Sequence, residues 1–183
     1  MSRPVRSLDE VLKSGIRDIP DYPQAGVVFK DITPLLADHS GFSQVVEALA
    51  ASGRDSDGNT VVDKVVGIEA RGFILAAPVA LALGAGFVPV RKKGKLPAAT
   101  YEESYSLEYG EATIEVHQDA FEPGDRVLVV DDVLATGGTV EACLRLVRRC
   151  GATVAGTTVL IELSFLPGRE RLAGEKLTAL VTV

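Results

Sequence analysis

The residues best suited to chemistry lie where an apolar run meets a glycine-rich turn. Residues 126–130 (RVLVV) are typical of a buried strand, and Asp131 and Asp132 follow them directly. After two intervening residues, the turn consists of Ala135, Thr136, Gly137, Gly138 and Thr139. Glycines allow close backbone approach, threonines offer hydroxyl groups, and a helix beginning near Gly138 would add unpaired N–H groups and its positive dipole end. The turn is therefore predicted to hold a phosphate without any lysine.

The two aspartates before this turn suit a ligand that carries hydroxyl groups or a divalent cation. Carboxylates accept hydrogen bonds from ribose hydroxyls and can share a cation with a substrate. The alternative is that the aspartates cap a helix and the glycines only shape a tight turn. We favour the ligand, because two adjacent like charges repel each other and an unliganded protein has no use for them there.

Four cations flank two other predicted strand ends. Arg71 follows the apolar run 65–68, and Arg91, Lys92 and Lys95 follow the apolar run 86–90. The net charge of the chain is −6, so an anionic ligand has to be held by a local basic site of this kind. The alternative is a solvated basic loop, which explains a single lysine better than four flanking cations.

Residues 91–110 show no regular pattern and are predicted to form a lid. A structureless run of about 20 residues inside a compact domain is usually a functional lid or a disordered segment. Tyr101, Tyr105 and Tyr109 recur every four residues, which leaves open a short helix that packs its aromatic side.

The elements around these residues alternate between strands and helices. Helical stripes or buried helices are predicted over 42–49, 72–83 and 140–147, and strands over 65–68, 86–90, 114–116, 126–130 and 153–163. This alternation indicates an α/β fold with a mainly parallel twisted sheet flanked by helices, and ligands of such sheets bind at the carboxyl ends of the strands. We expect a single domain, 1–183, with a core of about 37–163 and a small lobe from 1–36 and 164–183.

Composition excludes several classes of protein. The chain has 183 residues, 46% of them hydrophobic, which suffices for one core, and its acidic balance argues against general nucleic-acid binding. No apolar signal segment is found near the N-terminus, and Pro78 and three further glycines or prolines interrupt the uncharged stretch 72–90. We therefore expect a cytoplasmic protein with no membrane partner.

Cysteine and histidine content argues against disulfide and zinc chemistry. Cys143 and Cys150 would lie about 10 Å apart along a helix, too far for a disulfide, so two free thiols in a reducing compartment are expected. His39 and His117 are the two histidines of the chain, and neither belongs to a cluster with metal-ligand spacing.

The run 129–139 (VVDDVLATGGT) resembles the sequence signature with which type I phosphoribosyltransferases bind phosphoribosyl pyrophosphate (PRPP). It is most similar to the variant of this signature in the adenine-specific branch of the family. Residues 67–73 (GIEARGF) resemble the pyrophosphate loop of that family. Residues 91–97, running on to 105–110, are similar to its mobile catalytic lid. Residues 26–34 (GVVFKDITP) resemble the base-binding hood of the adenine-specific enzymes, and Glu162-Leu163 with 168–170 resembles their C-terminal signature.

The resemblance implies the type I phosphoribosyltransferase fold with a hood lobe. It also implies purine salvage, in which the 5-phosphoribosyl group of PRPP is transferred to N9 of adenine to give AMP and pyrophosphate. Mg²⁺ is expected to bind with PRPP rather than at a tight protein site, with Asp131 and Asp132 as candidate ligands. The expected partners are adenine and PRPP, and the expected assembly is a homodimer.

The resemblance also assigns residues to each part of the site. The phosphate and ribose are expected at Asp131, Asp132, Ala135, Thr136, Gly137, Gly138 and Thr139. The pyrophosphate is expected at Glu69, Ala70, Arg71, Arg91, Lys92, Lys95 and Tyr109. Adenine is expected at Val28, Phe29, Lys30 and Leu163. The catalytic candidates are Arg71, Asp131, Asp132 and, as the general acid or base, Glu108, for which an exposed loop glutamate is the alternative.

Three positions bear on the choice of base. Ala135 stands where oxopurine enzymes carry an aspartate, which disfavours hypoxanthine and guanine. Ala70 replaces a common serine, and Lys30 replaces a common arginine whose planar fork lysine cannot reproduce. The same reaction on guanine, hypoxanthine or xanthine remains an alternative. A non-catalytic PRPP-sensing regulator is another, although such regulators usually carry a DNA-binding segment that this chain has no room for.

Overall fold

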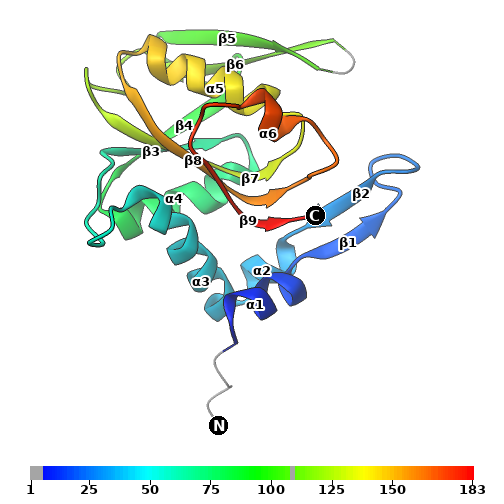
Figure 1. Cartoon of the computed structure of the whole chain (residues 1–183). Helices are drawn as coiled ribbons and strands as arrows, with labels where there is room; N and C mark the ends of the chain where they lie inside the picture. The colour runs from blue at the N-terminus through cyan, green and yellow to red at the C-terminus, as the bar shows by residue number, and fades with distance from the viewer. Residues whose placement is uncertain (1–5, 108–109) are drawn as a thin grey trace. The chain divides into compact units, whose positions relative to one another are not determined.

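The computed structural model describes residues 6–107 and 110–183, which fall into two compact units with bounds 1–47 and 48–183. The first unit contains α1 (Leu8–Gly15), β1 (Arg17–Pro20), β2 (Val28–Asp31), α2 (Thr33–Ala37) and most of α3 (His39–Ala50). The elements of both units are labelled in Figure 1.

The first unit is built around a helix and a two-stranded hairpin. Helix α1 begins with a capping box, in which Ser7 N–H donates to Glu10 Oε2 at 2.8 Å and the Ser7 hydroxyl accepts from Glu10 N–H. Strands β1 and β2 pair antiparallel, and Lys30 Nζ donates to Asp18 Oδ1 across them at 2.8 Å. The hairpin carries the residues expected to form the base-binding hood.

The second unit is organised by a seven-stranded mixed sheet of order β5-β6-β4-β3-β7-β8-β9. Its strands are β3 (Lys64–Ile68), β4 (Gly86–Lys92), β5 (Thr100–Ser106), β6 (Glu111–His117), β7 (Arg126–Leu134), β8 (Thr153–Glu162) and β9 (Leu177–Thr182). Its helices are the short η1 (Ala51–Gly53), α4 (Arg71–Leu83), α5 (Gly138–Arg149) and α6 (Gly168–Arg171). In the part of the sheet with the order β4-β3-β7-β8-β9, neighbouring strands are parallel. Strand β6 pairs antiparallel with both β4 and β5.

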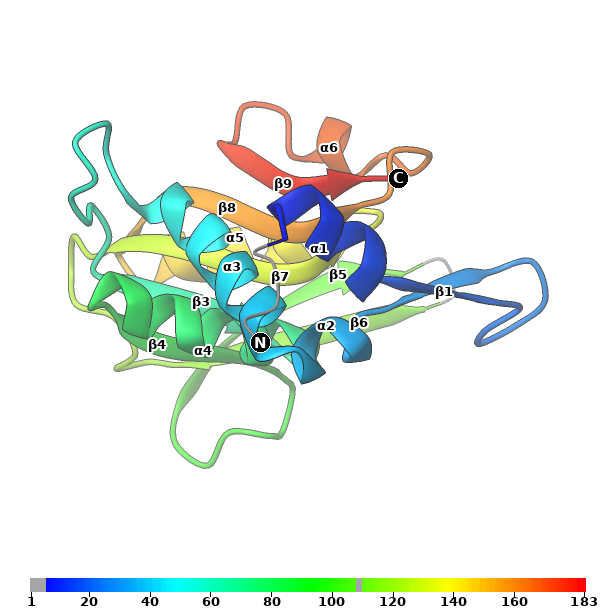
Figure 2. The same cartoon turned by 90° about the horizontal axis from the view of Figure 1, so that it is seen from below.

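The central strands are apolar because helices cover them on both faces. Helix α4 lies against one face and α5 against the other, as Figure 1 shows and Figure 2 presents from below. Val127 and Val129 of β7 belong to the core that includes Cys143 and Val147 of α5. Strands buried on both faces form continuous apolar runs, which explains why β3, β4 and β7 were predictable from the sequence. The predicted α/β class with a mainly parallel sheet is confirmed.

The segment 91–110 is not the structureless lid that the sequence predicted. Residues 100–106 form strand β5, paired with β6 in register from Thr100↔His117 to Ser106↔Glu111. The alternative of a short aromatic helix is also wrong, because Tyr101 and Tyr105 share one face of a strand and pack against the core. Loop 93–99 connects β4 to β5, and residues 108 and 109 lie outside the described part of the chain.

The C-terminal segment also differs from expectation. Residues 164–183 were expected to join residues 1–36 in an appended lobe, but β9 pairs parallel with β8 and completes the central sheet. The reason is that Leu177 and Ala179 place their side chains against the core on alternating positions of an edge strand. Residues 48–183 therefore form one unit, with residues 1–47 as the other.

Candidate functional site

The glycine-rich turn after β7 surrounds a small cavity at the start of α5. The cavity has a volume of about 80 Å³ and is lined by Asp131, Val133, Leu134, Ala135, Thr136, Gly137, Thr139 and Val140. Gly137 has φ +79°, a conformation that side chains rarely adopt, and α5 begins at the next residue. The structure therefore brings Asp131 and the predicted phosphate turn together at a helix N-terminus.

The two adjacent aspartates lie close to each other at the end of β7. Asp131 Oδ1 accepts from Asp132 N–H at 2.9 Å and would lie 2.8 Å from a Cβ on Gly72 of α4. The sequence predicted a strand over 126–130 that the two aspartates follow, but β7 continues through both of them to Leu134. Asp131 lines the cavity of the glycine-rich turn. Asp132 is turned toward α4, where its Oδ2 lies 2.7 Å from Arg71 Nε in an ion pair.

The electrostatics of the aspartate pair are unfavourable in the absence of a ligand. Burial, and then the charge of Asp132, raise the pKa of Asp131 well above its ordinary value. Burial also raises the pKa of Asp132, although the Arg71 guanidinium acts to lower it. Asp132 Oδ2 is buried and accepts no well-directed hydrogen bond, so its ion pair with Arg71 is poorly aligned. The pair therefore favours a ligand that brings positive charge or hydroxyl donors.

The predicted pyrophosphate residues gather at the carboxyl ends of β3 and β4. Glu69, which follows β3, accepts from Lys92 N–H at 2.9 Å and lies 3.2 Å from Arg91 Nε. The hydrogen bond from Lys92 and the Arg91 guanidinium lower the pKa of Glu69 despite its burial. The Glu69–Ala70 peptide bond is cis, and Ala70 precedes the first residue of α4, Arg71. Glu69 therefore orients Arg91.

Glu115 organises the loop between β4 and β5, a role that sequence analysis missed. Its Oε1 accepts from the N–H groups of Lys95 and Leu96, both at 2.8 Å. Burial acts to raise the pKa of Glu115, but hydrogen bonds from Leu96, Gly94 and Lys95 outweigh it and lower the pKa. Glu115 therefore holds the backbone of Lys95, the residue whose charged side chain is predicted to bind pyrophosphate. The sequence signal for this role is a glutamate that stands between two apolar residues, at 114 and 116, in a predicted strand.

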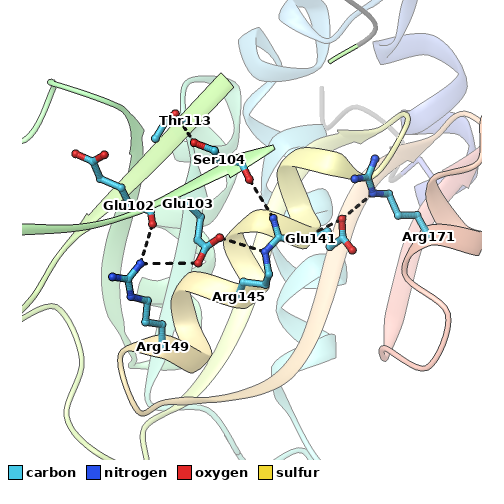
Figure 3. A network of polar contacts seen from close by, with 8 residues as sticks. All are labelled: Glu102, Glu103, Ser104, Thr113, Glu141, Arg145, Arg149 and Arg171. Carbon is cyan, nitrogen blue, oxygen red and sulfur yellow. Dashed lines mark hydrogen bonds and ion pairs between the residues drawn. The ribbon is translucent and has the colours of Figure 1, made fainter. Parts of the chain in front are cut away.

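Helix α5 holds strand β5 through two arginines (Figure 3). Arg145 Nε lies 3.2 Å from Glu103 Oε2, and Arg145 Nη2 donates to Ser104 O at 3.2 Å. Arg149 Nη1 donates to Glu102 O at 3.0 Å, and its guanidinium stands 5.1 Å from the centre of the Tyr101 ring. The part of the expected lid that forms β5 is therefore attached to the helix that carries the phosphate turn.

The C-terminal signature packs directly against the phosphate turn. A Cβ on Gly168 would lie 2.3 Å from Ala135 O and 2.9 Å from Leu134 Cγ, so this position has room only for glycine. Leu163 N–H donates to Leu134 O at 3.0 Å. Buried Glu162 receives two hydrogen bonds from Arg169, at 2.7 and 2.6 Å, which close the intervening loop. Leu163 therefore lies at the end of β7, beside the turn.

The remaining predicted site residues fall in other places. Val28, Phe29 and Lys30 lie on β2 of the first unit, where Val28 is half exposed and Phe29 packs edge-on against Tyr22 at 5.2 Å between ring centres. Glu108 and Tyr109 lie outside the described residues.

The described residues contain neither a metal-binding cluster nor a helix that could span a membrane. Within 6–107 and 110–183, no group of three or more His, Cys, Asp or Glu side chains is arranged to hold a metal ion. In the same ranges, no helix has both the length and the apolar character that crossing a membrane requires. Cys143 and Cys150 are free, and burial raises the pKa of the Cys143 thiol.

Comparison with known proteins identifies the family. Residues 35–176 match the family model described as a phosphoribosyl transferase domain. An adenine phosphoribosyltransferase from a Nocardioides species is 68% identical over 168 residues, which cover 92% of this chain and 91% of the relative. One from Acidothermus cellulolyticus is 62% identical over 98% of this chain and 99% of the relative. The chain belongs to the adenine phosphoribosyltransferase family.

Solved structures of adenine phosphoribosyltransferases share the fold. The enzyme from Rhodothermus marinus superposes with a TM-score of 0.89 at 52% identity, covering 96% of this chain and 98% of its own. The Saccharomyces cerevisiae enzyme, crystallised with adenine and an imino-altritol bisphosphate, gives a TM-score of 0.90 at 34% identity, covering 95% of this chain and 98% of its own. As a member of this family, the chain is an enzyme, a phosphoribosyltransferase.

Proposed function

We propose that the chain transfers the 5-phosphoribosyl group of PRPP to N9 of adenine, giving AMP and pyrophosphate in purine salvage. The observation that carries this proposal is the phosphate cavity, because it places Asp131 and the turn 135–139 at the N-terminus of α5. The pyrophosphate residues stand at the ends of the neighbouring strands β3 and β4. The names of the relatives support the same reaction.

Each part of PRPP has a matching group of residues. The turn 135–139 binds the 5′-phosphate through backbone N–H groups and the Thr136 and Thr139 hydroxyls. Asp131 and Asp132 accept from the ribose hydroxyls. The pyrophosphate contacts Glu69, Ala70, Arg71, Arg91, Lys92, Lys95 and Tyr109. Arg71 exchanges its poorly aligned contact with Asp132 for the pyrophosphate, which leaves the carboxylate available to the sugar.

The chemistry requires positioning, charge stabilisation and exclusion of water. Breaking the bond from C1 of the ribose to pyrophosphate passes through a cationic, oxocarbenium-like sugar, which nearby carboxylates such as Asp131 stabilise. The arginines stabilise the charge that develops on the leaving pyrophosphate. Glu108, which follows β5 in the sequence, takes the proton that adenine loses as N9 attacks.

Magnesium fits this site as an ion that arrives with PRPP. Bound to PRPP, Mg²⁺ would neutralise charge on the leaving pyrophosphate. Asp131 and Asp132 would hold the Mg²⁺ ion. Their carboxylates repel each other and Asp132 Oδ2 is buried, so an added positive charge would stabilise the pair. Two carboxylates leave most ligand positions to substrate oxygens and water, as is usual for Mg²⁺.

Adenine is proposed to bind to Val28, Phe29, Lys30 and Leu163. Leu163 supplies an apolar contact beside the phosphate turn, and Phe29 supplies a ring for stacking. Ala135 offers no carboxylate for an oxopurine ring. The cytoplasm is the proposed compartment, in keeping with the two free thiols.

Base selectivity tests the proposed reaction. With Mg²⁺ and PRPP, kcat/KM for adenine is expected to exceed that for guanine, hypoxanthine and xanthine by at least about 100-fold, because a site that hydrogen-bonds one base edge rejects another. Product nucleotide and pyrophosphate are measured for each base. Equal turnover of an oxopurine contradicts the base assignment, whereas PRPP binding without turnover of any base favours the PRPP-sensing regulator.

The proposal includes a homodimer that forms through the outer face of α4. Ile74, Pro78 and Leu81 lie on one face of this helix, and Ile74 and Leu81 are 43% and 83% exposed. Exposed apolar side chains grouped in this way usually mark an interaction surface. Leu81→Glu is therefore expected to shift the protein from dimer to monomer in sedimentation equilibrium. Phe165→Glu, at a 74% exposed position outside α4, is the control and should stay dimeric; a dimeric Leu81→Glu protein would refute this interface.

A further inference from the structure

Arg171, which no part of the proposed site uses, lies beside the phosphate turn. It is the last residue of α6, and its Nε donates to Glu141 Oε2 at 2.7 Å. Its Nη1 would stand 3.3 Å from a Cβ on Gly138, the first residue of α5. Figure 3 shows the side chain extending from the C-terminal segment toward Glu141. Arg171 and Thr136 also line the same surface hollow. A guanidinium therefore stands at the edge of the turn.

The glycine-rich turn carries no cation of its own, and a carboxylate lies close to it. Residues 135–139 contain no lysine or arginine, and Glu141 places a carboxylate in the first turn of the same helix. The hydrogen bond from Arg171, and then the charges of Arg171 and Arg145, lower the pKa of Glu141, so this carboxylate is ionised at neutral pH. A phosphate bound to the turn would meet that negative charge unless a cation stood between them.

We propose that Arg171 is a binding residue for the 5′-phosphate, oriented by Glu141. Glu141 Oε2 engages the Nε edge of the guanidinium at 2.7 Å, which leaves Nη1 on the side of Gly138. The guanidinium thus offsets the charge of Glu141 and supplies the cation that the turn lacks. This inference rests on the proposed function, because it assumes that the turn 135–139 holds the 5′-phosphate.

A surface ion pair without contact to substrate is the competing explanation, and the chain offers a matched control for it. Arg148, near the other end of α5, pairs with Glu175 at 2.8 Å. The two arginine side chains are similarly exposed, 38% for Arg171 and 49% for Arg148. Exposed pairs of this kind contribute little to stability, so both alanine variants should fold.

Calorimetric titration with AMP and with adenosine, which lacks the phosphate, tests the proposal. Arg171→Ala is expected to weaken AMP binding about tenfold, as for a charge-assisted hydrogen bond, and to leave adenosine binding unchanged. Arg171→Lys should recover part of the loss, and Arg148→Ala should match the wild type. An Arg171→Ala protein that matches Arg148→Ala, or that loses affinity equally for both ligands, overturns the proposal.

A comparison of AMP with adenosine tests separately whether the turn 135–139 holds the 5′-phosphate. Wild-type protein should bind AMP more tightly than adenosine, and Thr139→Val should reduce that preference because it removes a hydroxyl from the turn. If neither holds, the phosphate site itself is misplaced and the proposed function fails. If both hold while Arg171→Ala behaves like the wild type, the role of Arg171 alone is refuted.

Discussion

Asp131→Asn is expected to lower turnover about 100- to 1,000-fold, a typical effect of removing one charge-stabilising group from an active site, while it raises the melting temperature. The activity falls because the carboxylate no longer stabilises the cationic sugar. The stability rises because Asp131 is placed beside Asp132 and its pKa is raised by burial and by that neighbour, so an amide of the same size relieves an unfavourable charge. Steady-state kinetics and thermal unfolding of the same preparation measure both effects.

Asp132→Asn is the matched control for this prediction. It removes the neighbouring carboxylate, but it also breaks the ion pair in which Asp132 Oδ2 lies 2.7 Å from Arg71 Nε. Its turnover should fall as well, without the gain in melting temperature. The explanation fails if Asp131→Asn keeps wild-type turnover, or if both variants gain equal stability.

Gly168→Ala should raise the KM for PRPP or lower kcat, with a loss in kcat/KM of about 100-fold, because displacements of about 1 Å in an active site have effects of that size. The added Cβ would stand 2.3 Å from Ala135 O, a backbone atom of the phosphate turn, so the turn has to move. Overpacking of this kind also costs about 1–3 kcal/mol of stability. Kinetics with varied PRPP and chemical denaturation give the two quantities.

Gly156→Ala, on β8 of the central sheet, provides the comparison. Its Cβ would meet the nearest atoms of Lys176 at 3.6 Å, an ordinary van der Waals contact. This variant should retain wild-type kinetics. If the two alanine variants prove indistinguishable, the C-terminal segment does not hold the phosphate turn in place.

Strand β5 shows why part of the fold was not predictable from the sequence. Its inward face carries Tyr101, Glu103 and Tyr105, so a charged side chain interrupts the apolar alternation that identifies a half-buried strand. Glu103 is tolerated there because Arg145 and Arg149 of α5 lie 3.2 and 3.9 Å from its oxygens. The two arginines lie about 40 residues from Glu103 along the chain, and local sequence patterns carry no information on contacts at that separation.

The aspartate pair shows the same limit at the site. Because the pair lies between a strand and a glycine-rich turn, the sequence predicts that it binds a ligand. The sequence did not show that β7 continues through both aspartates to Leu134, or that Arg71 of α4 lies 2.7 Å from Asp132. Pairing with β8 through Leu134↔Glu162 extends the strand, and Arg71 pairs with Asp132 from a distant part of the sequence.

By itself the sequence determined the alternation of buried strands and helices, the glycine-rich turn after a buried strand and the cations at the strand ends. Apolar periodicity and glycine placement are local properties of the chain. Only the tertiary structure decided that β9 completes the sheet, that Gly168 closes on Ala135, and that Arg171 reaches the start of α5. These are contacts between distant segments, and they arise from packing of the folded core and from pairing of charges that the sequence leaves far apart.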